Sequence, residues 1–243
     1  MNQATGLQHD MSRSIRIMRK IFFTLFIIIP FCEPAPAQSP EASPSPALVV
    51  DSLAGEVHVL ATFHPKKFFG ALEGLLRVVP QYHFLVWDDG RASHEALFVT
   101  SVSDAEVVAA LEKIGGRPGN NLTMEAWDKR YDANHPAPQT RIAGTPVTIS
   151  IIWKDGREEI NISELLNDSD GKGFDFRFGG NMSMAHEWHS GCVVCLYSCP
   201  GSKVGNAAYT VRDYVTNQRR FTLQKKKWPP TGTPATIIFR VQR

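Results

Sequence analysis

The chain has 243 residues, enough for one large hydrophobic core or two small ones, and its formal net charge is +2. All of this excess positive charge lies within residues 1–37, and the acidic and basic residues of the remaining chain balance. A protein without a basic surface lacks the electrostatic attraction that nucleic-acid binding requires, so we expect no nucleic-acid partner.

Residues 1–37 have the pattern of a secretory signal peptide. Four basic residues between Arg13 and Lys20 precede the apolar run 21–31, and Ala35-Pro36-Ala37 offers a cleavage site. The apolar run is too short for a membrane-spanning helix of about 20 residues. We therefore expect an exported protein, periplasmic or secreted, which meets the membrane only through its signal peptide or an anchor.

The segment after the signal peptide, residues 38–47, is rich in proline and serine and is predicted to be a linker. We expect one folded domain over residues 48–243. Its first half contains apolar runs predicted to be strands at 48–50, 57–60, 82–87 and 96–100. Residues 66–79 are ambiguous, because helical spacing of apolar residues is interrupted by Gly70 and Gly74.

The clearest predicted helix covers residues 103–115. Ser103 is a natural N-cap, Glu106 completes a capping box, and Gly115-Gly116 end the apolar stripe. Further strands are expected at 145–153, 174–178, 209–215, 221–223 and 236–241, with a hairpin turn at 154–157 and a strand followed by a short helix at 160–166. The acidic turn 167–171 lacks the later ligands of a calcium loop. The fold class predicted is α+β, a strand-rich single domain with one helix and a cysteine-rich metal-binding loop.

One short run carries most of the chemistry of the chain: His189-x2-Cys192-x2-Cys195-x3-Cys199-Pro200. It keeps the spacing of the bacterial ferredoxin pattern C-x2-C-x2-C-x3-C-P, with His189 in place of the first cysteine. His186 lies three residues upstream. We expect a metal centre bound by Cys192, Cys195 and Cys199, with His189 as the preferred fourth ligand and His186 as a further candidate.

Three interpretations of this run remain open. An iron–sulfur cluster fits the spacing, although clusters are usually inserted before export. A single zinc ion fits three thiols and one imidazole. Thiol redox chemistry or a disulfide fits the Cys192-x2-Cys195 spacing and an oxidising compartment, but it leaves Cys199 unexplained.

The histidines also have a plainer interpretation as surface residues. His94, at the start of a predicted strand, is either a distant ligand of the same centre or a hydrogen-bonded strand-end residue. Glu95 beside it could orient an imidazole or act as a base, or it is a solvated charge. The sequence contains no G-x-S-x-G elbow, P-loop or dinucleotide fingerprint, so no catalytic residue is predicted.

Three stretches together resemble the YdjY-domain family of exported bacterial proteins: HEALFVTSVSDAEVVAALEKIGGRPG (94–119), TPVTISIIW (145–153) and GCVVCLYSCPGSKVGNAAYTV (191–211). The family's prototype has been described as ferredoxin-like because of its cysteines, and the resemblance implies no substrate or reaction. We expect an exported metal- or iron–sulfur-binding protein that transfers electrons to a redox partner protein. The alternative is a zinc- or disulfide-braced binding or structural module without catalysis.

Overall fold

A computed structural model of the chain describes residues 46–68, 71–72, 75–76, 82–153, 158–216, 220–224 and 228–242. The expected signal peptide (1–37), most of the linker (38–47) and the hairpin turn at 154–157 lie outside these residues. Pro44–Arg243 form one compact unit. Within the described part of the chain, no helix is both long enough and apolar enough to cross a membrane.

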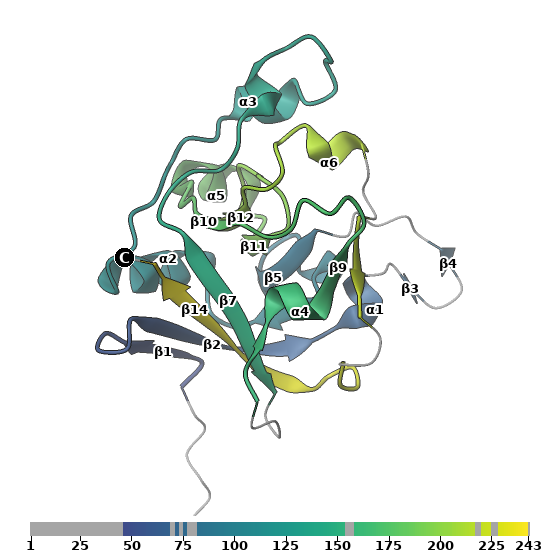
Figure 1. Cartoon of the computed structure of the whole chain (residues 1–243). Coiled ribbons are helices and arrows are strands. Elements are labelled where there is room, and N and C mark those ends of the chain that lie inside the picture. The colour runs from purple at the N-terminus through teal and green to yellow at the C-terminus, as the bar shows by residue number, and fades with distance from the viewer. Residues whose placement is uncertain are drawn as a thin grey trace, which may run out of the picture. The chain divides into compact units, whose positions relative to one another are not determined.

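Ten of the described strands form one mixed sheet, in the order β10-β12-β11-β5-β6-β2-β14-β7-β8, with β1 paired to β2 (Figure 1). Two small sheets, β13-β9 and β3-β4, lie outside it. The strands are β1 (Leu48–Asp51), β2 (Glu56–Phe63), β3 (Ala71–Leu72), β4 (Leu75–Leu76), β5 (His83–Trp87), β6 (Phe98–Thr100), β7 (Val147–Trp153), β8 (Ile160–Asn161), β9 (Leu166–Asp168), β10 (Phe176–Phe178), β11 (Cys192–Cys195), β12 (Val204–Asn206), β13 (Phe221–Leu223) and β14 (Pro234–Val241).

The long central strands bury one face of the sheet. Along β2, every second side chain from Val57 to Phe63 is buried, as expected for a strand with one face in the core. β14 pairs with β2 on one side and β7 on the other, and Figure 1 shows the three strands side by side. The sheet curls so far that the start of β7 meets β10, where Pro146 and Arg177 form a β-bridge and Phe178 N donates to Thr145 O at 2.9 Å.

The predicted helix at 103–115 is confirmed as α2 (Asp104–Lys113). The Ser103 side chain accepts from Glu106 N, and the Glu106 carboxylate accepts from Ser103 N, which completes the capping box. The other helices are short: α1 (Pro65–Phe68), η1 (Ser93–Glu95), α3 (Met124–Asp128), η2 (Ala137–Gln139), α4 (Ile162–Leu165), α5 (Met182–Trp188) and α6 (Asp213–Thr216). The predicted α+β class and its strand-rich character are confirmed.

Three segments differ from the sequence-based prediction. Residues 209–215 form a turn leading into α6 rather than a strand, because Asp213 caps this segment by accepting from Thr210 N. Residues 182–188 form a helix, α5, although their apolar residues show no helical period. The cysteine run, expected as a loop, begins as strand β11.

Arg240 joins the three central strands by its side chain. From β14 it donates to Glu56 on β2 at 2.7 Å and to Ser150 on β7 at 3.0 Å, and it also donates to Glu159, which precedes β8. The pKa of Glu56 is held below its usual range by hydrogen bonds from His58 and Arg240, and that of Glu159 by hydrogen bonds from Arg240 and Ser150.

We predict that Arg240→Gln lowers the free energy of unfolding at pH 7 by about 1 kcal/mol, as for a partly exposed ion-pair network. Because both folded-state pKa values are depressed, this stabilisation is present above the unfolded carboxyl pKa of about 4.3 and is lost as the pH falls through the folded values. Urea unfolding of variant and parent should therefore differ at pH 7 and converge in acid. Arg177→Gln, whose partner Asp175 lies on the same segment, is the control, and equal stability at pH 7 would contradict the prediction.

Candidate functional site

Two of the three cysteines lie on one strand at a spacing that normally separates them. Cys192 and Cys195 are three residues apart on β11, and side chains at that spacing point to opposite faces of a regular strand. The pairing of β11 with β5, however, shifts register between Cys192 and Val194 and again between Val194 and Cys195. Such irregularities re-aim side chains. As a result, the Cys195 thiol interacts with the thiols of both Cys192 and Cys199.

The third cysteine follows in a loop whose side chains are anchored on both sides. The Ser198 hydroxyl donates to Tyr209 O at 2.6 Å and accepts from Ile142 N at 2.8 Å. The carbonyl oxygen of Cys199 accepts from the Ser202 hydroxyl at 2.8 Å. These bonds fix the backbone that presents the Cys199 thiol.

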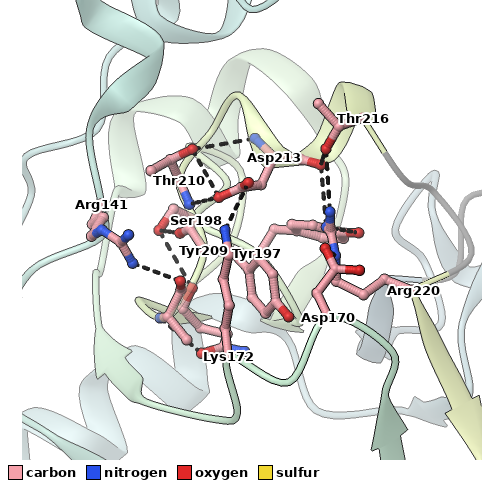
Figure 2. Close-up of polar contacts among 12 residues, drawn as sticks. Arg141, Asp170, Lys172, Tyr197, Ser198, Tyr209, Thr210, Asp213, Thr216 and Arg220 are labelled. Carbon is pink, nitrogen blue, oxygen red and sulfur yellow. Dashed lines mark hydrogen bonds and ion pairs between the residues drawn. The ribbon is translucent and has the colours of Figure 1, made fainter.

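A buried arginine holds the residue at the start of this loop (Figure 2). Arg220 is 2% exposed and donates to the Tyr197 hydroxyl at 2.6 Å. It also pairs with Asp170 of the acidic turn and donates to Thr216 and to the Asp213 carbonyl, each at 3.2 Å. The acidic turn is therefore part of a structural network that fixes the cysteine loop.

The imidazole of His83, which the sequence did not single out, lies beside the Cys192 thiol. His83 is the first residue of β5, and its Nδ1 lies 3.2 Å from Cys192 Sγ. Burial lowers the pKa of His83 to about 4, so the ring is neutral at pH 7. The sequence signal was present but weak: one histidine at the edge of the otherwise apolar run HFLVW.

All three thiols are buried, and those of Cys195 and Cys199 are protonated at neutral pH. Burial raises the pKa of Cys195, and hydrogen bonding to Cys195 together with burial raises that of Cys199. Lys203 is fully buried nearby, and its Nζ lies 3.5 Å from Asp104 at the start of α2. Burial lowers the Lys203 pKa, while Asp104 and the thiols of Cys192 and Cys199 oppose that shift.

His83 and two of the cysteines line a cavity of about 260 Å³, which we call the thiol pocket. Three large aromatic side chains, two cysteines and two histidines contribute to its walls. The lining residues are Tyr82, His83, Arg91, Ala92, His94, Glu95, Trp127, Trp188, Ser190, Cys192 and Cys199. A small pocket with apolar walls and a few converging polar groups is typical of a ligand site.

The mouth of the thiol pocket is held in place by backbone contacts. Arg91 N donates to His189 O at 2.8 Å, and Ala92 N donates to Ser190 O at 3.1 Å. This docking requires glycine, because a Cβ on Gly90 would lie 2.5 Å from the Cα of Gly191. The turn carries η1, and with it His94 and Glu95, to the pocket.

The two predicted histidine ligands lie elsewhere on the surface. His186 is on α5, and His189 follows it in the left-handed conformation that ends the helix; both are exposed. Within the described part of the chain, neither the His186 imidazole nor the His189 imidazole contacts a thiol. Their role as metal ligands stays a prediction. Within the described ranges, no three or more histidine, cysteine, aspartate or glutamate side chains are already arranged to hold a metal ion. The three cysteines are free.

The fold and the thiol pocket define a strand-rich α+β protein with three buried free cysteines, one of which contacts a buried histidine. The chain belongs to the YdjY domain family, whose model matches residues 48–240. A relative, the uncharacterized protein YdjY of Escherichia coli (strain K12), is 34% identical over 163 residues, which cover 65% of this chain and 67% of that protein. No solved structure matches the chain. The family resemblance predicted from the sequence is thus confirmed.

We predict that Gly90→Ala destabilises the protein by about 2–3 kcal/mol, because the added Cβ meets backbone atoms that cannot move aside independently. The same change should speed the reaction of Cys192 with a thiol reagent, since it loosens the turn over the pocket. Thermal unfolding and thiol-labelling rates measure both effects. Gly55→Ala is the control for destabilisation without a clash, because its φ of +70° strains an alanine although a Cβ there meets nothing within 4 Å. It should cost about 1 kcal/mol and leave the labelling rate unchanged. Unchanged labelling would show that this docking does not shape the pocket.

We predict that Arg220→Met lowers the free energy of unfolding by about 3 kcal/mol, because it removes the hydrogen bonds of the buried guanidinium to the Tyr197 hydroxyl and to Asp170. Lys172→Met removes an ion pair of Asp213 that is more exposed, and it should cost less than about 1 kcal/mol. Denaturant unfolding of both variants tests this. Equal effects of the two substitutions would contradict the role given to Arg220.

Proposed function

We propose that this is an exported protein that binds a metal centre in its thiol pocket through Cys192, Cys195 and Cys199, with His83 as the fourth donor. The observation that carries the proposal is a chain of contacts at the buried end of a pocket: the neutral His83 imidazole and the Cys192 and Cys199 thiols line it, and the Cys195 thiol interacts with both of these thiols. Thiolates and imidazoles are the ligands preferred by zinc and other soft or borderline ions.

His83 suits this role better than the histidines of the cysteine run. It lies on β5, the strand that pairs with β11, so the fold itself holds its ring beside Cys192. His83 stays neutral at pH 7, which leaves a ring nitrogen free to bind a metal. His189, by contrast, contributes its backbone carbonyl to the docking of the turn at Arg91.

The spacing of the donors favours one ion over a cluster. Cys192 Sγ and His83 Nδ1 are 3.2 Å apart, and the thiol of Cys195 interacts with both of the other thiols. Zinc–ligand bonds of about 2.0–2.3 Å bring two ligands of one ion to a similar separation, whereas a cluster holds its ligands further apart. Binding still requires the side chains to rotate toward one point and the thiols to lose their protons, because the donors are not already arranged around an ion.

The metal centre would supply either a brace for the pocket or, if it is redox-active, a route for electrons to a partner protein. Lys203, buried beside the thiols, is positioned to offset part of the negative charge of thiolates. The competing candidate, thiol–disulfide chemistry, is favoured by one observation: the Cys195 thiol interacts with the thiols of Cys192 and Cys199.

Zinc titration of the full reduced chain, with chelator competition, tests the proposal. We predict one ion per chain, and a loss of affinity of about ten- to a hundredfold in His83→Gln and Cys192→Ser. His189→Gln is the matched control and should leave the affinity unchanged. Thermal unfolding of each metal-free variant shows whether it has folded.

Metal and acid-labile sulfide analysis of protein purified without oxygen separates the alternatives. If the protein contains both iron and acid-labile sulfide, the centre is an iron–sulfur cluster and the proposal of a single ion is wrong. If the protein contains no metal and fewer than three free thiols, the proposal of a metal centre is wrong and disulfide chemistry is favoured. Loss of affinity in His189→Gln but not in His83→Gln would restore His189 as the ligand.

A further inference from the structure

The metal-binding groups of the thiol pocket form a series from solvent to the buried thiols. At the mouth, the side chain of His94 is 61% exposed and that of Glu95 is 17% exposed. At the inner end, His83 is 6% exposed and Cys192 is 1% exposed. All four residues line the same cavity. A cation that reaches the thiols through this cavity therefore passes oxygen and nitrogen donors first and sulfur donors last.

His94 and Glu95 are paired at the mouth. His94 Nε2 lies 3.4 Å from Glu95 Oε1, and both side chains belong to the short helix η1. The docking of Arg91 and Ala92 onto the 189–190 backbone holds this helix at the pocket. The position of the pair thus depends on the same backbone contacts that shape the pocket.

The charge distribution of the lining makes this pair distinctive. Glu95 is the one carboxylate among the described lining residues, and Arg91 is a cation at the same mouth. Tyr82, Trp127 and Trp188 supply aromatic walls. The charge of Glu95 also acts on His83, since it opposes the effect of burial on that imidazole.

We propose that His94 and Glu95 form a capture site for a soft or borderline divalent cation, which they pass to the thiols and His83. This inference rests on the proposed metal-binding function and adds a route to it. Capture exchanges water ligands of the ion for an imidazole nitrogen and a carboxylate oxygen. Transfer then replaces these by thiolate sulfurs, and the thiol protons leave to solvent. No electron moves in either step.

The test is the rate of Cd²⁺ binding to the full reduced chain, followed by stopped-flow absorbance of the thiolate–cadmium bonds. We expect His94→Ala and Glu95→Gln to slow association by about tenfold at low ionic strength, because they remove the donors and the negative charge at the mouth. The equilibrium affinity should stay unchanged, since neither residue is a final ligand.

The chain offers a matched control pair. His135 Nε2 lies 3.4 Å from Glu125 Oε1, the same separation as in the capture pair, but neither residue lines the thiol pocket. His135→Ala and Glu125→Gln remove the same groups and should leave the association rate unchanged.

The outcomes separate this inference from the proposed function. Failure of the parent chain to bind Cd²⁺ overturns both. Binding by the parent with unchanged rates in His94→Ala and Glu95→Gln overturns the capture site alone. Loss of equilibrium affinity in His94→Ala also overturns it, because His94 would then be a resident ligand. If the two control variants slow association equally, the effect comes from the net charge of the protein, and the capture site is overturned as well.

Discussion

The irregular pairing of β5 with β11 is the constraint on which the site depends. A regular ladder would send Cys192 and Cys195 to opposite faces of the sheet, and one thiol would be lost to the other side. The two register shifts place both thiols together and set His83 beside Cys192. The backbone of the next segment, Trp87 to Ala92, continues along residues 189–191 and closes the mouth of the pocket. Strand pairing, site geometry and access to solvent are thus consequences of one contact between two distant segments.

Local chemistry explains what the sequence could predict. The capping box of α2 and the alternation along β2 involve residues close in the chain, so Ser103, Glu106 and the strand at 57–60 were enough to place these elements. The segment 209–215 was predicted wrongly because a local hydrogen bond, from Thr210 N to Asp213, overrides the β-propensity of its tyrosines and valines. The cysteines could be singled out because their spacing is itself a local pattern, and their role as ligands stays a prediction.

The rest of the site depends on contacts between distant residues. His83 is separated from Cys192 by 109 positions, and no local pattern relates them. The ferredoxin spacing pointed to His189 because it assumes that all the residues lie in one loop. Cys192 and Cys195 instead lie on a strand, whose neighbour β5 brings His83 beside them. Arg220 shows the same limit: it stabilises the cysteine loop through Tyr197, yet it lies more than twenty residues beyond it. His94 could be named as a remote candidate, but only the docking of its turn brings it to the pocket.

The ionisation of the buried thiols depends on the positive charges that lie near them. A protonated thiol behaves as a small apolar group, so the thiols of Cys195 and Cys199 can be buried together at little cost. A buried thiolate is unfavourable unless a cation lies near it. Lys203 is such a cation, but it is already shared with Asp104. Burial and hydrogen bonding between the thiols therefore favour the neutral forms of Cys195 and Cys199, and a further positive charge nearby would favour their ionisation. Under the proposed function, a metal ion that enters past the donor groups of His94 and Glu95 would supply this charge and displace the thiol protons inside.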